Sequence, residues 1–185
     1  IIQVENLRGS MNNIKLSVVI PAYNEERNLS KGVLDEVGDY LEKLGLMYEV
    51  IIVDDGSEDD SADLIKKYIL RKNIPNRDGK FKLIKNSHGG KAKAVISGME
   101  ASEGEIVLFT DMDQATPINQ LDKFLPKFEE GFDIAIGSRQ GRRGAPMVRR
   151  LAALVFSILR GIILGLPFKD TQCGFKAFKA KCLKD

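Results

Sequence analysis

The stretch "IVLFTDMDQATP" (residues 106–117) runs from five mostly apolar residues straight into two aspartates, Asp111 and Asp113. Its first half has the length and composition of a buried strand. A buried carboxylate is costly unless it is paired or bound to a cation. If the strand continues, the two side chains point the same way and can share one ligand. The stretch therefore predicts a half-site of hard oxygen ligands for Mg²⁺ and substrate phosphates. The alternative is a pair of loop caps, with Asp113 starting the next segment.

Four more β-rich runs surround this one in the chain, and segments with helical spacing lie between them. Strands that alternate with helices predict βαβ units and a mostly parallel sheet. The runs are almost continuously apolar, as expected where helices cover both faces of a sheet. The predicted strands are residues 15–20, 48–53, 81–84, 105–110 and 132–137, and the predicted helices include residues 29–45 and 60–72.

Polar clusters follow four of the predicted strands. The sequences "PAYNEE", "DDGSED", "DMDQ" and "SRQGRR" come directly after them. Right-handed crossovers bring the carboxyl ends of parallel strands to one edge of the sheet, and ligands bind at that edge in open α/β sheets. We therefore expect a single site that is built from four strand ends.

The first two clusters suit a nucleotide. Tyr23 could stack on a base and Glu25 could bind a ribose, although a helix cap and a packed tyrosine explain the same residues. In "VDDGSED" (residues 53–59), an aspartate could accept a hydrogen bond from a base or a ribose hydroxyl. Ser57 or Asp59 could instead cap the helix that follows.

The stretch "NSHGGKAKAV" (residues 86–95) places two glycines before a helix whose first turn holds Lys91 and Lys93. Helix N-termini attract phosphate groups, although the pattern is not that of a P-loop. His88 is the only histidine in the chain, and we expect it to be structural or exposed. A serine or cysteine triad needs a histidine as its base, so we do not expect one in this chain.

The C-terminal third of the chain is basic. Residues 139–185 carry 11 Lys/Arg against 2 Asp/Glu, which indicates an anionic partner such as a phosphate or a membrane surface, or else a solvated basic face. Aromatic residues do not interleave with the arginines, so we do not expect nucleic acid as a partner. Residues 151–166 are the most apolar stretch of the chain and contain one arginine, and they fit either a core helix or an amphipathic helix on a membrane.

Five motifs, in this order, resemble those of family 2 glycosyltransferases with the GT-A fold: "SVVIPAYNEERNL", "EVIIVDDGSEDDS", "DMD", "IGSR" and "DTQCGFKAF". The last is similar to the motif of enzymes that make polyprenyl-phosphate sugars, the dolichyl-phosphate glucose and mannose synthases. The resemblance covers about residues 14–180. It implies a Rossmann-like, three-layer α/β/α domain with a mostly parallel sheet.

The resemblance also implies a role for each matching position. Asp111 and Asp113 would hold the sugar and the diphosphate through Mg²⁺ or Mn²⁺ and would be catalytic together with Arg139. Gln114 stands one position before the glutamine of the mannose synthase pattern, so we do not expect it to bind metal. The acceptor phosphate would contact Arg139, Arg149 and Arg150. The nucleotide pocket would be formed by Pro21, Ala22, Tyr23, Glu25, Val53, Asp55, Ser57, Lys91, Asp111 and Met112.

The reaction implied by the resemblance is an inverting transfer of a sugar from a nucleotide-diphosphate donor to a polyprenyl or dolichyl phosphate, on the cytoplasmic side of a membrane. UDP-glucose is the favoured donor and GDP-mannose the second choice. One alternative is transfer to a saccharide hydroxyl, for which Asp170 is the candidate base. Another is a nucleotide-sugar-binding module without turnover, which the intact "DMD" argues against.

The length of 185 residues fits one domain that can bury a core without disulfide bonds. We expect residues 1–10 to be an added leader before a natural start at Met11. Residues 11–185 are expected to form a single catalytic domain that is incomplete at its C-terminal end. Cys173 and Cys182 are too few for a disulfide framework and are expected to be plain thiols. The sequence indicates no oligomeric state.

Overall fold

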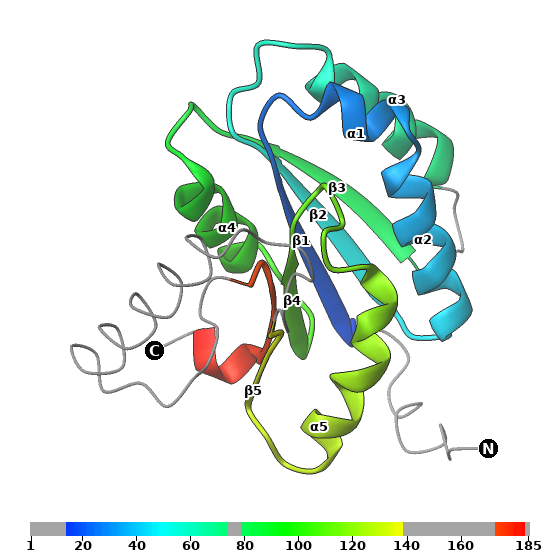
Figure 1. Ribbon diagram of the computed structural model, residues 1–185, viewed down its shortest axis with the longest axis vertical. Coiled ribbons are helices and arrows are strands. Elements are labelled where there is room, and N and C mark those ends of the chain that lie inside the picture. The colour runs from blue at the N-terminus through cyan, green and yellow to red at the C-terminus, as the bar shows by residue number, and fades with distance from the viewer. Residues whose placement is uncertain (1–13, 74–78, 139–172, 184–185) are drawn as a thin grey trace, which may run out of the picture.

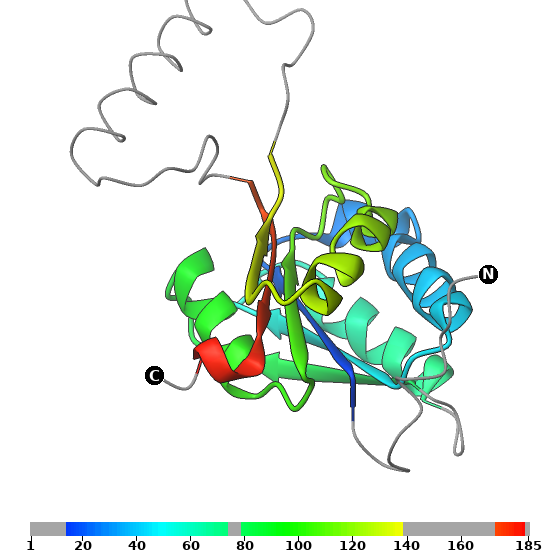
Figure 2. The same ribbon diagram turned by 90° about the horizontal axis from the view of Figure 1, so that it is seen from below.

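The structure is a computed structural model that describes residues 14–73, 79–138 and 173–183. It is built on one six-stranded sheet in the order β3-β2-β1-β4-β6-β5. Helices α1, α2, α3 and α5 lie on one face of this sheet and α4 lies on the other (Figures 1 and 2). The three-layer α/β fold predicted from the sequence is confirmed.

The elements follow the predicted rhythm closely. The strands are β1 (Leu16–Ala22), β2 (Tyr48–Asp54), β3 (Gly79–Lys85), β4 (Ile106–Thr110), β5 (Ile134–Ile136) and β6 (Phe175–Lys179). The helices are α1 (Glu26–Ser30), α2 (Val33–Leu44), α3 (Ser61–Lys72), α4 (Lys91–Glu100) and α5 (Leu125–Glu129), with short 3-10 helices η2 (Ile118–Lys123) and η3 (Ala180–Leu183).

The structure differs from the predicted elements in two ways. Residues 29–45 do not form one helix, because Gly32 adopts a left-handed backbone (φ 81°) that separates α1 from α2. Strand β6 was not predicted at all. It runs antiparallel to both β4 and β5, so β5 is parallel to β4 although β6 lies between them.

Alternation along the central strands builds a core on each face of the sheet. Val18 and Ile52 pack with α2 and α3, whereas Val19, Ile51 and Val53 point to the opposite face, where α4 lies. Burying each such side chain stabilises the fold by about 1.5–3 kcal/mol. The two-sided core explains why the strand sequences are almost continuously apolar.

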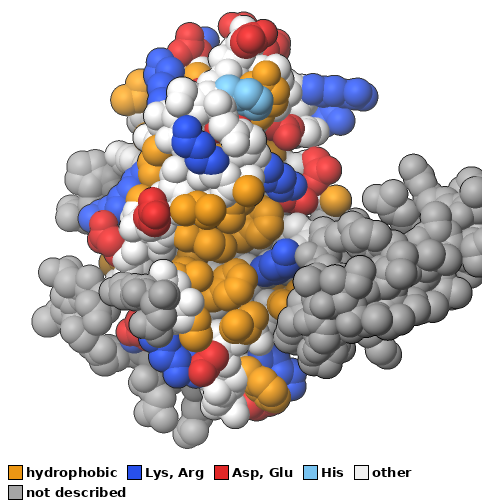
Figure 3. All heavy atoms as spheres, turned by 90° about the vertical axis from the view of Figure 1, so that its left-hand side faces the viewer, with side chains coloured by type: hydrophobic (Ala, Val, Ile, Leu, Met, Phe, Trp, Pro, Cys, Tyr) orange, Lys and Arg blue, Asp and Glu red, His pale blue; other side chains and the backbone are white. Residues whose placement is uncertain are grey.

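A shallow groove of about 530 Å³ lies between α4 and strands β4 and β6. Apolar side chains gather on this side of the molecule (Figure 3). The groove is lined mainly by Val95, Ile96, Met99, Phe109 and Phe178. No helix among the described residues is both long and apolar enough to cross a bilayer. The apolar segment at residues 151–166 lies outside the described part of the chain.

Candidate active site

The carboxyl ends of β1, β2 and β4 meet the start of α4 around a pocket of about 220 Å³. The parallel pairing of these strands places their ends at one edge, as the sequence predicted. The pocket is lined by Pro21, Ala22, Tyr23, Glu25, Asp55, His88, Lys91, Ala94, Asp111, Met112 and Asp113. Three of the four polar clusters therefore contribute to one site.

Some predicted site residues lie elsewhere. Val53 is fully buried in the core beneath α4 and does not line the pocket. Ser57 accepts a hydrogen bond from the backbone N–H of Asn24 at 3.0 Å, so it braces two loops. The fourth polar cluster begins at Ser138, but its arginines, which include Arg139, lie outside the described residues. Arg149 and Arg150 lie outside them as well.

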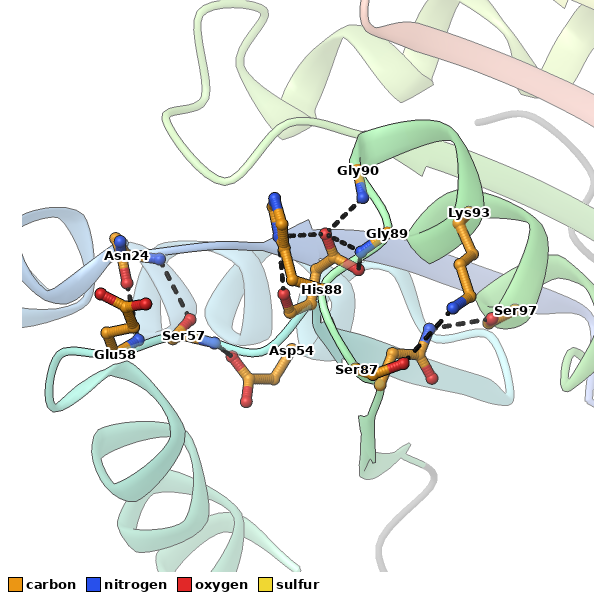
Figure 4. A network of polar contacts seen from close by, with 12 residues as sticks. Asn24, Asp54, Ser57, Glu58, Ser87, His88, Gly89, Gly90, Lys93 and Ser97 are labelled. Atoms are coloured by element: carbon orange, nitrogen blue, oxygen red, sulfur yellow. Dashed lines mark hydrogen bonds and ion pairs between the residues drawn. The ribbon is translucent and has the colours of Figure 1, made fainter.

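Asp55 organises the loop that leads into α4. Its carboxylate is almost fully buried and accepts hydrogen bonds from the backbone N–H groups of Gly89 (3.1 Å) and Gly90 (2.8 Å). His88 Nδ1 lies 3.0 Å from the same carboxylate, and Figure 4 shows these donors converging on one point. Both carboxylate oxygens of Asp55 accept hydrogen bonds from the loop, so Asp55 positions the start of α4.

Two aromatic rings form one wall of the pocket. Tyr23 and His88 stack with ring centroids 4.3 Å apart and planes 29° apart. Asn24, with a left-handed backbone (φ 54°), braces the loop after β1 by accepting from Glu58 N–H at 2.9 Å (Figure 4). His88 was not predicted as a site residue. The sequence feature that could have indicated its place is the pair of glycines before α4, because their backbone N–H groups bond to Asp55 beyond the end of β2.

Asp111 and Asp113 reach the pocket through a turn and not through strand alternation. β4 ends at Thr110, and the backbone and side-chain nitrogens of Gln114 both donate to the carbonyl of Asp111, at 3.2 and 2.9 Å. The assumption that the strand continues was therefore wrong, although both aspartates line the same pocket. Asp113 also accepts from Ala115 N–H at 3.0 Å, which is a bond within the turn. It does not cap the next segment, because the N-cap of η2 is Pro117.

The carboxylate of Asp111 is held from two sides. Its Oδ1 lies 2.6 Å from Nζ of Lys91, the first residue of α4. On the other side, a Cβ added at Gly174 would overlap this carboxylate, so the backbone just before β6 is in direct contact with it. Gly174 belongs to the "DTQCGFKAF" motif, but its contact with Asp111 could not be read from the sequence, because β6 itself was not predicted.

The donor set fits a divalent cation bound together with a phosphate ligand. Asp111 and Asp113 supply hard oxygens, and the buried Oδ1 of Asp111 already faces positive charge. Among the described residues, no group of three or more His, Cys, Asp or Glu side chains could hold a metal by itself. Mg²⁺ is commonly held by one or two carboxylates with substrate phosphates and water, and this site matches that pattern.

Comparisons with known proteins agree with this fold and show the family. The model of glycosyl transferase family 2 matches residues 17–185. A dolichyl-phosphate beta-glucosyltransferase of Dictyostelium discoideum is 34% identical over 190 residues, which cover 95% of this chain and 57% of that protein. The human dolichyl-phosphate beta-glucosyltransferase is 35% identical over 180 residues, covering 89% and 54%. The chain thus spans about half the length of these curated relatives.

Solved structures show the same fold. A mannosyltransferase from Pyrobaculum calidifontis, in complex with GDP-Man and Mn²⁺, superposes with a TM-score of 0.63 at 20% identity, covering 94% of this chain and 47% of that one. A glucosyl-3-phosphoglycerate synthase from Mycobacterium tuberculosis, in complex with UDP, has a TM-score of 0.60 at 23% identity, covering 90% and 57%. From the family match and the shared fold, the chain belongs to glycosyl transferase family 2.

Proposed function

We propose that this chain transfers a sugar, with inversion, from a nucleotide-diphosphate sugar to a polyprenyl phosphate. The observation that carries the proposal is the convergence of Asp111, Asp113 and Lys91 in one pocket beside the stacked rings of Tyr23 and His88. The rings offer a planar surface for a base. The two carboxylates and the ammonium suit a diphosphate that is bound with a cation.

The relatives favour a lipid phosphate as acceptor and glucose as the sugar. Two of them are dolichyl-phosphate beta-glucosyltransferases, and a third, from Proteus mirabilis, is an undecaprenyl-phosphate 4-deoxy-4-formamido-L-arabinose transferase that is 30% identical over 165 residues. We therefore propose UDP-glucose as the donor and keep GDP-mannose as the second choice. The cation is proposed to be Mg²⁺ or Mn²⁺, held by Asp111 and Asp113.

The proposed chemistry needs no strong general base. The anionic oxygen of the acceptor phosphate forms a bond to the anomeric carbon while the bond from that carbon to the diphosphate breaks, and the bonding electrons leave with the diphosphate. A bound divalent cation supplies charge stabilisation to this leaving group. Lys91 adds a positive charge on the same side, and Tyr23 with His88 orients the nucleotide.

A lipid acceptor would place the reaction at a membrane surface, and we propose the cytoplasmic side. The roles of Arg139, Arg149 and Arg150 toward the acceptor phosphate remain predictions, since these residues lie outside the described part of the chain. They follow from the bidentate fit between guanidinium and phosphate groups.

The test is calorimetric titration of UDP, GDP, UDP-glucose and GDP-mannose, with and without Mg²⁺ or Mn²⁺. We expect one nucleotide class to bind in a metal-dependent way. The Asp113→Asn variant should lose at least about tenfold in metal-dependent affinity, because a carboxylate ligand of the metal is gone. Its melting temperature should stay close to that of the wild type, since Asp113 is exposed.

Asp63→Asn is the matched control, because it makes the same chemical change on α3, at a residue that does not line the pocket. It should leave nucleotide affinity unchanged. Binding that is insensitive to metal, or an equal loss in both variants, would remove Asp113 from the metal site. Failure of all four nucleotides to bind would contradict the proposed function of this chain.

A further inference from the structure

Lys91 occupies a position from which it can act on the metal site itself. As the first residue of α4, it extends its ammonium group to 2.6 Å from Oδ1 of Asp111 and 5.8 Å from the ring centroid of Phe109. The helix is aimed there by Asp55, which accepts from Gly89 and Gly90 just before it. The ion pair is therefore built into the loop that forms the pocket wall.

Asp111 needs this positive charge more than Asp113 does. The Asp111 side chain is 27% exposed and its Oδ1 is buried, so the ionised form requires a compensating partner. Asp113 is exposed and accepts a hydrogen bond from Ala115 N–H. Lys91 thus supplies to Asp111 the kind of charge that a divalent cation would supply to the pair.

A cation that binds Oδ1 of Asp111 would meet the ammonium of Lys91 as a like charge at short range. The two therefore compete for this oxygen. Lys91 can leave it at little cost, because its side chain is 59% exposed and carries a flexible four-carbon stem. Lys91 also lines the pocket, so its side chain can turn toward an anionic ligand there without any movement of the helix.

We propose that Lys91 is a displaceable internal cation. It balances Asp111 when no metal is bound, is expelled when a divalent cation takes the same oxygen, and then pairs with the diphosphate of the donor. The first of these statements rests on the ion pair alone, the second also on the proposed metal site at Asp111, and the third on the proposed function. The consequence is that metal and donor bind cooperatively, since the metal frees the cation that the donor uses.

The first experiment titrates the full chain with Mn²⁺ alone and follows free Mn²⁺ by electron paramagnetic resonance. Lys91→Met should bind Mn²⁺ about tenfold more tightly than the wild type, because the competing charge is gone. Lys91→Arg retains the charge and should stay within about twofold of the wild type. Circular dichroism checks that each variant is folded.

Lys93→Met is the matched control. It removes the same charge from the same helical turn, but Lys93 points toward Ser87, with the amine 3.5 Å from its hydroxyl (Figure 4). It should leave Mn²⁺ affinity within about twofold of the wild type, because distant exposed charges are screened. Equal tightening in both methionine variants would reduce the effect to net charge and overturn the proposal. So would unchanged or weaker Mn²⁺ binding in Lys91→Met, or no Mn²⁺ binding to any of the proteins.

The second experiment titrates UDP and GDP at saturating Mn²⁺. The nucleotide that binds the wild type should bind Lys91→Met at least about tenfold more weakly, because the freed ammonium is missing. Tighter Mn²⁺ binding in Lys91→Met together with no nucleotide binding to any protein would support the internal cation and contradict the proposed function. Nucleotide binding that is equal in wild type and Lys91→Met would overturn the donor contact of Lys91.

Discussion

Gly174 shows how a residue without a side chain can determine where a carboxylate lies. Its Cα faces Asp111, and the volume that a Cβ would fill is taken by the carboxylate. The oxygen nearest to that volume is Oδ2, whereas Lys91 pairs with Oδ1 of the same carboxylate. Asp111 is therefore confined between a backbone contact and a charge.

Gly174→Ala should move the Asp111 carboxylate out of this position. We expect a loss of at least about tenfold in Mn²⁺ affinity, comparable to the loss of a partner that orients a metal ligand. The measurement is Mn²⁺ titration by electron paramagnetic resonance at a temperature where the variant is folded.

Gly104→Ala provides the control for a general packing defect. A Cβ there would lie 2.6 Å from the backbone nitrogen of Ser17, so it is also overpacked, but at the opposite end of the strands. It should lower stability without changing the affinity for Mn²⁺. If both variants lose Mn²⁺ affinity equally, the contact of Gly174 with Asp111 has no specific effect on the site.

Helix α4 carries Lys91 into the pocket and is seated on the sheet through Gly98. A Cβ at this position would overlap the side chain of Val19 and lie 3.0 Å from Cγ2 of Val53. The helix can approach β1 and β2 this closely only because Gly98 has no side chain. The distance of α4 from the sheet and the placement of Lys91 are thus linked.

Gly98→Ala is expected to destabilise the protein by up to about 2 kcal/mol. Overpacking costs about 1–3 kcal/mol, and the better helix propensity of alanine recovers up to about 1 kcal/mol. Urea unfolding measures the net effect. Ala92→Gly, at an exposed position of the same helix, reports the propensity difference without a packing change. A Gly98→Ala protein that is more stable than the wild type would show that the helix shifts freely on the sheet.

The sequence predicted the parallel strands of this sheet well, because buried strands and turn residues leave local patterns. It missed β6, since "GFKAF" pairs with β4 from 65 positions away, between residues 110 and 175, and nothing local marks that pairing. The roles of Asp55 and His88 were also not foreseen in full. Asp55 contacts residues that lie 33 to 35 positions further along the chain, His88 among them, and only the fold brings them together.

A buried charge network joins the sheet at the end opposite the pocket. The carboxylate of Glu49 is fully buried and accepts from the Ser17 hydroxyl (2.6 Å) and from Glu103 N–H (2.7 Å). Lys82 Nζ lies 2.8 Å from its second oxygen. The network connects β1, β2, β3 and the loop before β4, so it ties these neighbouring strands together.

Lys82→Met should destabilise the protein at neutral pH, because it leaves the buried Glu49 carboxylate without its cation. Burial lowers the pKa of Lys82, but hydrogen bonds to Glu49 and Glu103 outweigh burial and leave it above its ordinary value of 10.5. The stability that Lys82 contributes is therefore fully present below pH 10.5 and is lost as pH rises through the raised folded value.

Urea unfolding from neutral to strongly alkaline pH checks this prediction. The difference in unfolding free energy between wild type and Lys82→Met should shrink as pH rises beyond 10.5. Burial also raises the pKa of Tyr40 and Tyr68, but both proteins share that alkaline loss and it cancels in the difference. Lys80→Met, an exposed change on the same strand, serves as the control. A difference that is independent of pH would mean that Lys82 acts through packing alone.

The late position of β6 in the chain has a consequence for biosynthesis. At ~5–20 residues per second, roughly 3–13 s pass between the emergence of Thr110 and that of its pairing partner Phe175. During this interval one edge of β4 has no strand beside it, and β5 lacks the neighbour with which it pairs. A nascent chain can thus assemble its parallel strands well before it can seat Asp111, and it presents an open edge to chaperones while it waits.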